Sequence, residues 1–391
     1  MSVYDESLKL HEKFKGKIEV VSKVPVTSKE ELSLAYSPGV AEPCNRIAAN
    51  VNDVYKYTSK GNMVAVVTDG TAVLGLGDIG PEAALPVMEG KAILFKNFAG
   101  VDAFPICLDT KDTEEIIKAV KLIAPGFGGI NLEDISAPRC IEIERRLKEE
   151  LDIPVFHDDQ HGTAIVTVAA IINSYKLLKE KNLSTAKVVI NGAGAAGSSI
   201  AKLIRDLGVG EILILDRKGI IRKSEMESYD FSKKELAEIT NPNDIKGDLA
   251  TAMVGADIFV GVSVAGALTP EMVKTMNKDP LIFAMANPTP EIMPELALEA
   301  GAKIVGTGRS DYPNQVNNVL AFPGLFKGAL RAGSKKISEE MKMAAARAIA
   351  GLLKEEELTP EYIIPNPFDD RVAEAVAMEV ERIAKEQNLC R

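Results

Sequence analysis

The sequence of 391 residues contains no tryptophan, only three histidines and only four cysteines. The cysteines form no C-x-x-C pair, and their spacing predicts neither a zinc site nor a disulfide framework. They are Cys44, Cys107, Cys140 and Cys390. We therefore expect reduced thiols and a cytoplasmic protein.

Long apolar runs and an excess of positive charge are also missing. No run approaches the length of a membrane span, and residues 1–17 lack the apolar core of a signal peptide, so we expect no membrane partner. The net charge of −10 argues against a nucleic-acid surface, which needs clustered Lys and Arg. Small anionic substrates stay compatible with this charge, because a metal or a local cationic site can bind them.

Short apolar strands alternate with helices along most of the chain. We expect strands at 63–68, 103–108, 128–132, 155–157, 187–191, 211–215, 257–261, 281–284 and 303–306. We expect helices at 83–98, 113–124, 140–151, 163–180, 197–207, 338–353 and 371–387. This alternation predicts an α/β fold, with an N-terminal α/β domain at 1–160 and a Rossmann-like doubly wound parallel-sheet domain at 161–391. The second domain carries the C-terminal helices.

A glycine-rich loop lies between the expected strand at 187–191 and the helix that follows. The segment 187–197 reads KVVINGAGAAG and contains the pattern G-x-G-x-x-G. In this pattern one glycine forms the tight turn, one lets the backbone approach a pyrophosphate, and one lets helix and strand pack closely. The helix N-terminus then offers free N–H groups to the phosphates. The predicted dinucleotide-binding residues are Gly192, Ala193, Gly194, Ala195, Ala196 and Gly197.

An acidic residue at the end of the next strand supports this prediction. Asp216 follows Gly192 by 24 residues, close to the spacing of about 20 that is typical of a ribose-binding acid. Such an acid favours NAD. Arg217 and Lys218 follow at once and could hold a 2′-phosphate, so the sequence leaves NAD and NADP open.

Two acidic pairs fall at the ends of apolar strands. They are Glu133-Asp134 and Asp158-Asp159. Adjacent carboxylates are usually solvated loop residues, and burying them in a cleft is costly unless a cation neutralises them. Their position at strand ends, where open α/β folds bind ligands, favours a hard-oxygen site for Mg²⁺ or Mn²⁺.

Lys91 and two histidines are less decisive. Helical periodicity puts Lys91 on a largely apolar stretch, so it is either a surface lysine with a buried stem or a partly buried one; the neighbours favour the second. His157 and His161 flank the second acidic pair but lack a third ligand at zinc spacing, which favours a structural role.

Taken together and in order, short motifs along nearly the whole chain resemble those of the small, prokaryotic-type malic enzymes. The matching segments, besides the glycine loop, are YSPGVA at 36–41, VTDG at 67–70, LGLGDIG at 74–80, MEGKA at 88–92, NLED at 131–134, VFHDDQHGTA at 155–164, ANPTP at 286–290 and QVNN at 315–318.

The resemblance implies an enzyme that oxidises malate and decarboxylates it to pyruvate and CO₂, with NAD or NADP and with Mg²⁺ or Mn²⁺. It implies that Tyr36 is the general acid, that Lys91 is the general base and that Asp158 orients Lys91. The implied metal ligands are Glu133, Asp134 and Asp159. Asn287 and Asn317 would lie near substrate and nicotinamide. The N-terminal domain would bind substrate and metal, and the assembly would be a homodimer.

One departure concerns the second carboxylate of malate. Larger malic enzymes carry an arginine just before the L-G-L-G-D motif, whereas residues 71–73 here read TAV. Binding of that carboxylate must then depend on other groups, such as Ser37, Asn287, Asn317 or the metal.

Three other functions fit parts of the pattern. A malolactic enzyme resembles this family and turns malate into lactate without net redox change. A metabolite sensor on the same scaffold would need no acid and base. The presence of the whole set argues against a sensor: Tyr36, Lys91, Glu133, Asp134 and Asp159. A Rossmann dehydrogenase without decarboxylation leaves the four acids unexplained.

Overall fold

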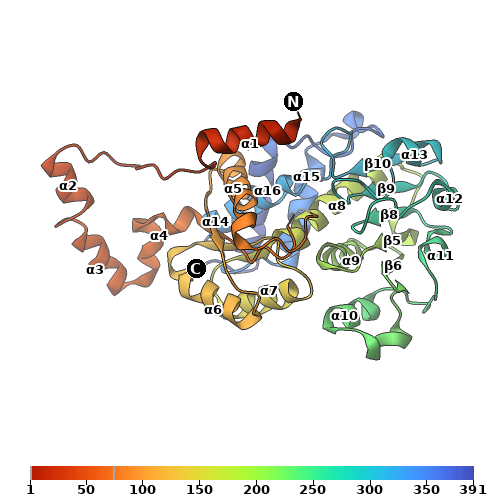
Figure 1. Ribbon diagram of the computed structural model, residues 1–391, viewed down its shortest axis with the longest axis horizontal. Coiled ribbons are helices and arrows are strands. Elements are labelled where there is room, and N and C mark those ends of the chain that lie inside the picture. Colours follow the sequence, from red (N-terminus) through yellow and green to blue (C-terminus); the bar gives the residue numbers. More distant parts are fainter. Residues whose placement is uncertain (1, 74) are drawn as a thin grey trace.

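The computed structural model describes residues 2–73 and 75–391, which form one parallel and one largely parallel sheet, both flanked by helices (Figure 1). The strands are β1 (Met63–Thr68), β2 (Asp102–Cys107), β3 (Gly129–Leu132), β4 (Val155–His157), β5 (Lys187–Asn191), β6 (Glu211–Asp216), β7 (Gly219–Ile220), β8 (Ile258–Gly261), β9 (Leu281–Ala284) and β10 (Ile304–Thr307). Their alternation with helices confirms the expected α/β class.

The helices vary widely in length. They are α1 (Val3–Phe14), α2 (Lys29–Ala35), α3 (Ala41–Ala49), α4 (Val54–Tyr57), α5 (Pro81–Leu94), α6 (Thr113–Ile123), α7 (Arg139–Glu150), α8 (Asp158–Leu177), α9 (Ala195–Leu207), α10 (Phe231–Ile239), α11 (Leu249–Met253), α12 (Pro270–Val273), α13 (Pro294–Glu299), α14 (Phe322–Ala332), α15 (Glu339–Gly351) and α16 (Arg371–Glu386). None of them, within the described part of the chain, is both long enough and apolar enough to cross a membrane.

The first sheet has the order β2-β1-β3-β4, and all its strands are parallel. Strand β1 (MVAVVT) is apolar on both faces, as expected for a strand covered on both sides. Val64 and Val66 belong to one buried cluster with Met88 of α5, whereas Ala65 and Val67 belong to another with α6 and α7. Helices therefore cover both faces and leave the carboxyl edge of the strands for polar residues.

The second sheet has the order β10-β9-β8-β5-β6-β7. Five strands are parallel, and the short β7 pairs antiparallel with β6. The strand order reverses next to β5, the strand that leads into the glycine loop. In open α/β sheets, ligands bind in the crevice at such a reversal.

The C-terminal helices pack against the first sheet as well as the second. The Phe95 ring lies 4.8 Å from the Phe322 ring and 5.4 Å from the Phe326 ring, and Phe156 lies 5.9 Å from Phe326. Residues before 160 and after 320 thus share one hydrophobic core. Helix α14, which the sequence did not predict, is the element that connects them.

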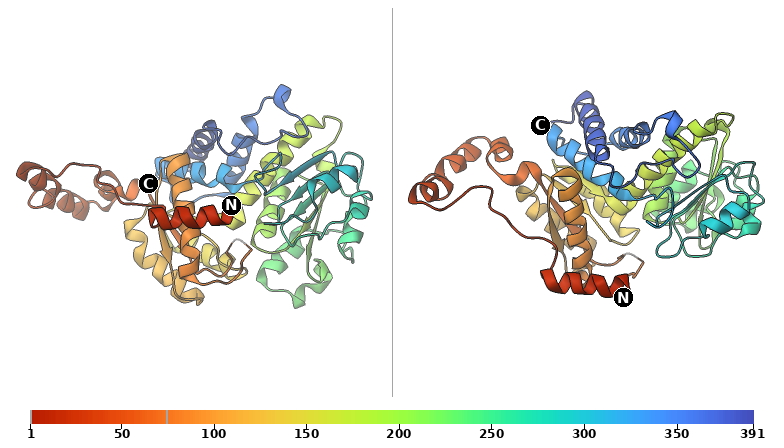
Figure 2. Two further views of the ribbon diagram at one scale, coloured as in Figure 1. Left: turned by 45° about the horizontal axis from the view of Figure 1, so that its top comes forward. Right: turned by 90° about the horizontal axis from the view of Figure 1, so that it is seen from above.

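The N-terminal arm, residues 28–57, projects from the rest of the molecule (Figures 1 and 2). It consists of α2, α3, α4 and the turns between them, and none of these helices contains a buried residue. Helices this short are marginal in water without a packing partner. The arm therefore lacks, within this chain, the packing that would stabilise it.

Candidate active site at the edge of the first sheet

Two parallel neighbours, β3 and β4, deliver the four acids to one edge of the first sheet. Glu133 and Asp134 directly follow β3, while Asp158 and Asp159 directly follow β4. Helix α8 begins at Asp158, five residues earlier than the expected start at 163, so the second pair forms the first turn of a helix. The dipole at a helix N-terminus favours negative charge there.

Lys91 reaches this edge from α5 and is buried, with 7% of its surface exposed. Its ammonium Nζ lies 2.6 Å from Asp158 Oδ2 and 2.9 Å from Glu133 Oε1. It also lies 4.3 Å from the centre of the Phe322 ring. The structure therefore excludes a surface lysine with a solvated head.

Burial and the neighbouring opposite charges shift the pKa values of Lys91, Glu133 and Asp158 in opposite directions. Burial alone would lower the pKa of Lys91, but Asp158 and Glu133 outweigh it and raise the pKa above its ordinary value. Burial raises the pKa of Glu133 well above its ordinary value, and it raises that of Asp158, although Lys91 opposes both shifts. One ammonium thus lies among several carboxyl groups, and their combined charge is compatible with a further cation.

Three of these acids could bind such a cation: Glu133, Asp134 and Asp159. Each offers a carboxylate oxygen, and the three oxygens lie within 4.8 Å of one another. Hard carboxylate oxygens at this spacing suit Mg²⁺ or Mn²⁺, which bind oxygen ligands at about 2.1 Å. Asp159 Oδ2 already accepts the Asp134 backbone N–H at 2.8 Å, which aligns the two residues. The residues present therefore fit a divalent cation.

Further side chains that the sequence did not single out hold the acids in place. Asn318 donates a hydrogen bond from Nδ2 to Asp158 Oδ2, and Asn131 Nδ2 donates to Glu133 Oε2 at 2.8 Å. Gly162 packs so closely that a Cβ there would collide with Asp158 Oδ1. The sequence motifs that contain these residues could be recognised. The spacing within a motif does not predict which side chains of distant segments contact each other.

The predicted substrate asparagines lie on two loops of the second half of the chain. Asn287 is exposed and is joined to Pro288 by a cis peptide bond. Its backbone carbonyl lies so near Gly75 that a Cβ on that glycine would be 3.0 Å away. Asn317 is half-buried and uses its side-chain Oδ1 to accept the Val319 N–H. It is the next residue, Asn318, that contacts Asp158.

Tyr36 is the one predicted catalytic residue that stands apart from these acids. It is the C-terminal cap of α2 in the projecting arm, and 67% of its surface is exposed. All three views separate α2 from α5, the helix that carries Lys91 (Figures 1 and 2). Within this single chain, the structure does not bring Tyr36 together with Lys91.

The loop at residues 71–73, where the sequence has no arginine, contacts an arginine of another segment. Arg139, at the start of α7, donates from Nη2 to Asp69 Oδ2 at 2.8 Å and to Thr71 Oγ1 at 3.1 Å. The Ala72 N–H donates to the Asp134 carbonyl at 2.9 Å, so this loop borders the acids. Leu74, the first residue of the L-G-L-G-D motif, lies outside the described residues.

The glycine loop opens into a cavity of about 730 Å³ at the edge of the second sheet. Gly192 has a φ of +121°, which favours glycine, and a Cβ on Gly197 would collide with the Gly192 carbonyl. Helix α9 begins at Ala195, with Gly194 as its N-cap. Asp216 borders the same cavity, and its side chain accepts from the Lys218 N–H at 2.7 Å and pairs with Lys233 at 2.6 Å.

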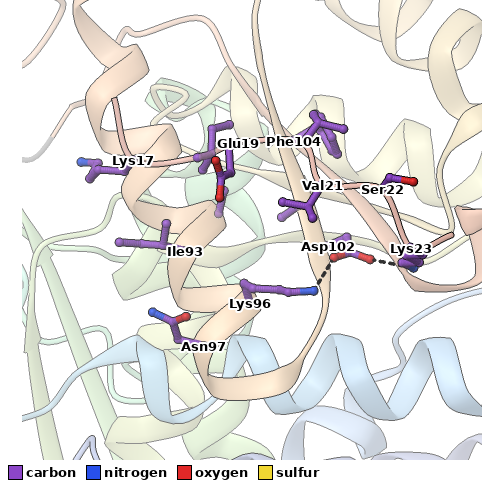
Figure 3. A pocket seen from close by; sticks show the side chains of 14 residues that line it. Lys17, Glu19, Val21, Ser22, Lys23, Ile93, Lys96, Asn97, Asp102 and Phe104 are labelled. Carbon is purple, nitrogen blue, oxygen red and sulfur yellow. Dashed lines mark hydrogen bonds and ion pairs between the residues drawn. The ribbon is translucent and has the colours of Figure 1, made fainter. Parts of the chain in front are cut away.

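A separate groove of about 750 Å³ runs beside α5 and the edge strand β2 (Figure 3). Its walls combine apolar side chains, including Ile18, Val21, Ile93 and Phe104, with the Asp102 ion pairs. None of the acids near Lys91 lines this groove. It is therefore a surface feature distinct from the acidic edge.

These features define a dinucleotide-binding α/β protein with an acidic edge and a buried lysine. Residues 15–148 match the family described as "Malic enzyme, N-terminal domain", and residues 160–385 match "Malic enzyme, NAD binding domain". The chain belongs to the malic enzyme family. The resemblance drawn from its motifs is thereby confirmed.

Relatives of similar length support this assignment. A "Bifunctional malic/malolactic enzyme" of Bacillus subtilis is 62% identical over 100% of this chain and 95% of its own length. An "NAD-dependent malic enzyme" of Geobacillus stearothermophilus is 56% identical over 100% of this chain and 81% of its own. The crystal structure of an NAD-dependent malic enzyme from Thermotoga maritima superimposes with a TM-score of 0.92, at 53% identity over 96% of this chain and 98% of that one.

Proposed function

We propose that the protein catalyses the oxidative decarboxylation of malate to pyruvate and CO₂, with reduction of NAD or NADP. The observation that carries this proposal is the buried Lys91 between Asp158 and Glu133, beside the three acids that fit a cation. A plain dehydrogenase needs no such acids. Decarboxylation does need them, because a divalent cation at Glu133, Asp134 and Asp159 would polarise the substrate and stabilise an enolate.

Lys91 is the proposed general base for the C2 hydroxyl of malate. As the chain stands, Glu133 and Asp158 favour its charged form. Glu133 is also a proposed cation ligand, so engaging it elsewhere removes one of the two carboxylates that keep Lys91 protonated. Asp158, further held by Asn318, then orients the amine. Asn287 and Asn317 are proposed to contact the substrate and the nicotinamide.

Tyr36 is the proposed acid that protonates the enolate carbon, and a second copy of the chain is proposed to supply it. The arm that carries Tyr36 has no buried residue and exposes Leu34, Val40 and Val51. A group of apolar side chains this exposed is typical of a surface that a partner covers. The groove beside α5 offers an apolar surface on the helix that carries Lys91. A symmetric homodimer would exchange both arms at once.

Mixed dimers test this exchange directly. Lys91→Ala and Tyr36→Phe would each inactivate a uniform dimer. If the sites are shared, random mixing makes half of the dimers mixed, each with one intact site, so about a quarter of wild-type activity returns. If Tyr36 serves its own chain, no mixed dimer has an intact site and no activity returns. A monomer in solution would also contradict the exchange.

The malolactic reaction is the second candidate, because a 62% identical relative is named for both activities. The two reactions differ in product and in net redox change. A steady-state assay with malate, Mn²⁺ and either nucleotide should yield pyruvate and stoichiometric reduced nucleotide. Lactate without net reduction would favour the malolactic reaction. Failure to turn over malate with Mg²⁺ or Mn²⁺ and either nucleotide would overturn the proposed function.

Asp216 supports NAD over NADP as the preferred nucleotide. A carboxylate at the end of the second strand accepts hydrogen bonds from the ribose hydroxyls and repels a 2′-phosphate. Lys233 and the Lys218 N–H already hold it in position. Arg217 is exposed beside it and is the group that would oppose this preference.

A further inference from the structure

Glu144 of α7 makes contacts at both ends of the acidic segment that opens α8. Its Oε1 accepts the backbone N–H of His157 at 3.1 Å, immediately before Asp158. Its Oε2 lies 2.8 Å from Nε2 of His161, two residues after Asp159. Glu144 is only 4% exposed. One buried carboxylate thus bridges the residues on either side of the acid pair.

The opposite edge of the His161 ring is fixed as well. Ser199 Oγ lies 2.5 Å from His161 Nδ1, and Lys342 Nζ lies 3.1 Å from the same nitrogen. Ser199 belongs to α9, the helix that follows the glycine loop, and Lys342 belongs to α15. With a proton on Nε2, the ring donates to Glu144, and the single lone pair on Nδ1 faces the two donors Ser199 and Lys342.

At its first residue, α8 is held by Lys91 and Asn318 through the Asp158 side chain, but its N-cap residue supplies no side-chain cap to the backbone. Its N-cap is His157, which makes no side-chain capping hydrogen bond. Asp158 and Asp159 therefore begin a helix whose first turn depends on contacts from neighbouring elements. Four carboxyl groups on one edge repel each other, so the segment needs such contacts to keep its geometry.

We propose that Glu144 is a positioning residue, which clamps residues 157–161 through the His157 N–H and His161 and so aims Asp158 at Lys91 and Asp159 at the cation. Outer partners that orient metal ligands typically contribute 10- to 100-fold to metal affinity. The clamp itself is an observed set of contacts; its consequence for the cation rests on the proposed function. Ser199 completes the clamp by holding the far side of the ring.

The test measures Mn²⁺ binding to the full-length protein without substrate, by isothermal titration calorimetry. Glu144→Gln keeps the size of the side chain but loses one of the two acceptors, so only one arm of the clamp survives. We expect Mn²⁺ affinity to fall about 10- to 100-fold. NADH affinity, followed by NADH fluorescence, should stay within about twofold, because Glu144 does not border the nucleotide cavity. In turnover, KM for Mn²⁺ should rise far more than KM for NAD.

Glu339→Gln is the matched control. Glu339 pairs with Lys342 at 2.6 Å and belongs to the same cluster of charges, but it makes no contact with residues 157–161 among the described hydrogen bonds. Its Mn²⁺ affinity should match that of the wild type. If both variants lose affinity alike, the effect is general electrostatics, and the clamp is refuted.

Ser199→Ala keeps the inference testable if Glu144→Gln fails to fold. It removes one hydrogen bond from His161 and should weaken Mn²⁺ binding about 3- to 10-fold, while the melting temperature falls by no more than about a few degrees. If Glu144→Gln folds and its Mn²⁺ affinity is unchanged, the clamp is overturned. If only Ser199→Ala folds, unchanged Mn²⁺ affinity in that variant overturns the clamp. In both cases the proposed function stands. Absence of Mn²⁺ binding in the wild type would instead overturn the proposed function, and the clamp's purpose with it.

Discussion

The ammonium of Lys91 lies 2.6 Å from Asp158 Oδ2, and both side chains are buried. They come from different elements, α5 and the first turn of α8. Their desolvation is costly, and a buried pair of this kind is weak evidence for stability. Its position at the edge of a parallel sheet is better explained by chemistry that needs an amine beside oxygen ligands.

Replacing Lys91 with methionine should abolish malate oxidation while preserving nucleotide binding. The change removes the proposed base but keeps much of the volume, and loss of a general base typically costs 10²- to 10⁴-fold in rate. We expect kcat to fall by at least about 10²-fold and NADH affinity to stay near wild type. The measurements are steady-state turnover and NADH fluorescence titration.

Lys179→Met is the control for Lys91→Met. Lys179 makes an exposed ion pair with Glu355, and within the described part of the chain neither residue contacts the acids near Lys91. Exposed pairs contribute little, so activity should be nearly unchanged. Substantial turnover in Lys91→Met, or equal losses in both variants, would contradict the assignment of Lys91 as base.

Gly162→Ala should impair the site although alanine is the better helix former. A Cβ at Gly162 would collide with Asp158 Oδ1, and the next contact, with Asn318 Cβ, would be only 2.9 Å. We expect a loss of about 1–3 kcal/mol in the free energy of unfolding, together with reduced kcat, because Asp158 must move. Denaturant titration and turnover measure the two effects.

Gly351→Ala, at the end of α15, should not lower the free energy of unfolding. A Cβ at Gly351 would meet nothing within 4 Å, and its φ is not positive. It should be neutral or stabilising by up to about 1 kcal/mol. A stable, fully active Gly162→Ala variant would show that Asp158 tolerates displacement.

Local patterns were sufficient to predict most elements of the two sheets. The strands β1, β5 and β9 lie where the apolar runs predict them, because short β-branched runs between turn residues have few alternatives. Helix α8 was predicted to begin at 163 but begins at Asp158. Its first turn is polar, so periodicity could not detect it, and tertiary contacts from Glu144 and Asn318 hold it in place.

The acidic residues could be predicted as a group, but the contacts among them could not. That strand ends meet at one edge follows from a parallel sheet, and this brings Glu133 near Asp159. The partner of each side chain depends on packing between distant segments, as with Asn318 and Asp158. The separation of Tyr36 from Lys91 also depends on the path of the arm, which no local pattern specifies.

Asp216→Ala should shift the nucleotide preference from NAD toward NADP. Hydrogen bonds to a charged acceptor contribute about 1.5–3 kcal/mol, so kcat/KM with NAD should fall about 10- to 100-fold. The change also releases Lys233, which pairs with Asp216 at 2.6 Å and would then be available to a 2′-phosphate. Steady-state kinetics with both nucleotides measure the ratio. An unchanged ratio of kcat/KM with NAD to kcat/KM with NADP would argue that Asp216 does not contact the ribose. Asp206→Asn, on the exposed end of α9, serves as control.

Lys342 should make the free energy of unfolding rise with pH above about 8. Burial, reinforced by Lys148, lowers the pKa of Lys342 from 10.5 to about 8 in the folded chain. Between these values the unfolded chain binds more protons than the folded one, so raising the pH favours folding. Below about 8 both states are protonated, and the full cost of burying the ammonium remains.

Comparison with Lys342→Met isolates this contribution from other titrating groups. Lys60, whose pKa burial also lowers to about 8, contributes equally to both proteins and cancels in the difference. The wild type should therefore gain stability relative to Lys342→Met as pH rises from about 8 to 10, as measured by urea unfolding at fixed ionic strength. Lys336→Met, at an exposed lysine nearby, should produce no such pH-dependent difference. A constant difference between wild type and Lys342→Met across this range would mean that Lys342 keeps its ordinary proton affinity in the folded protein.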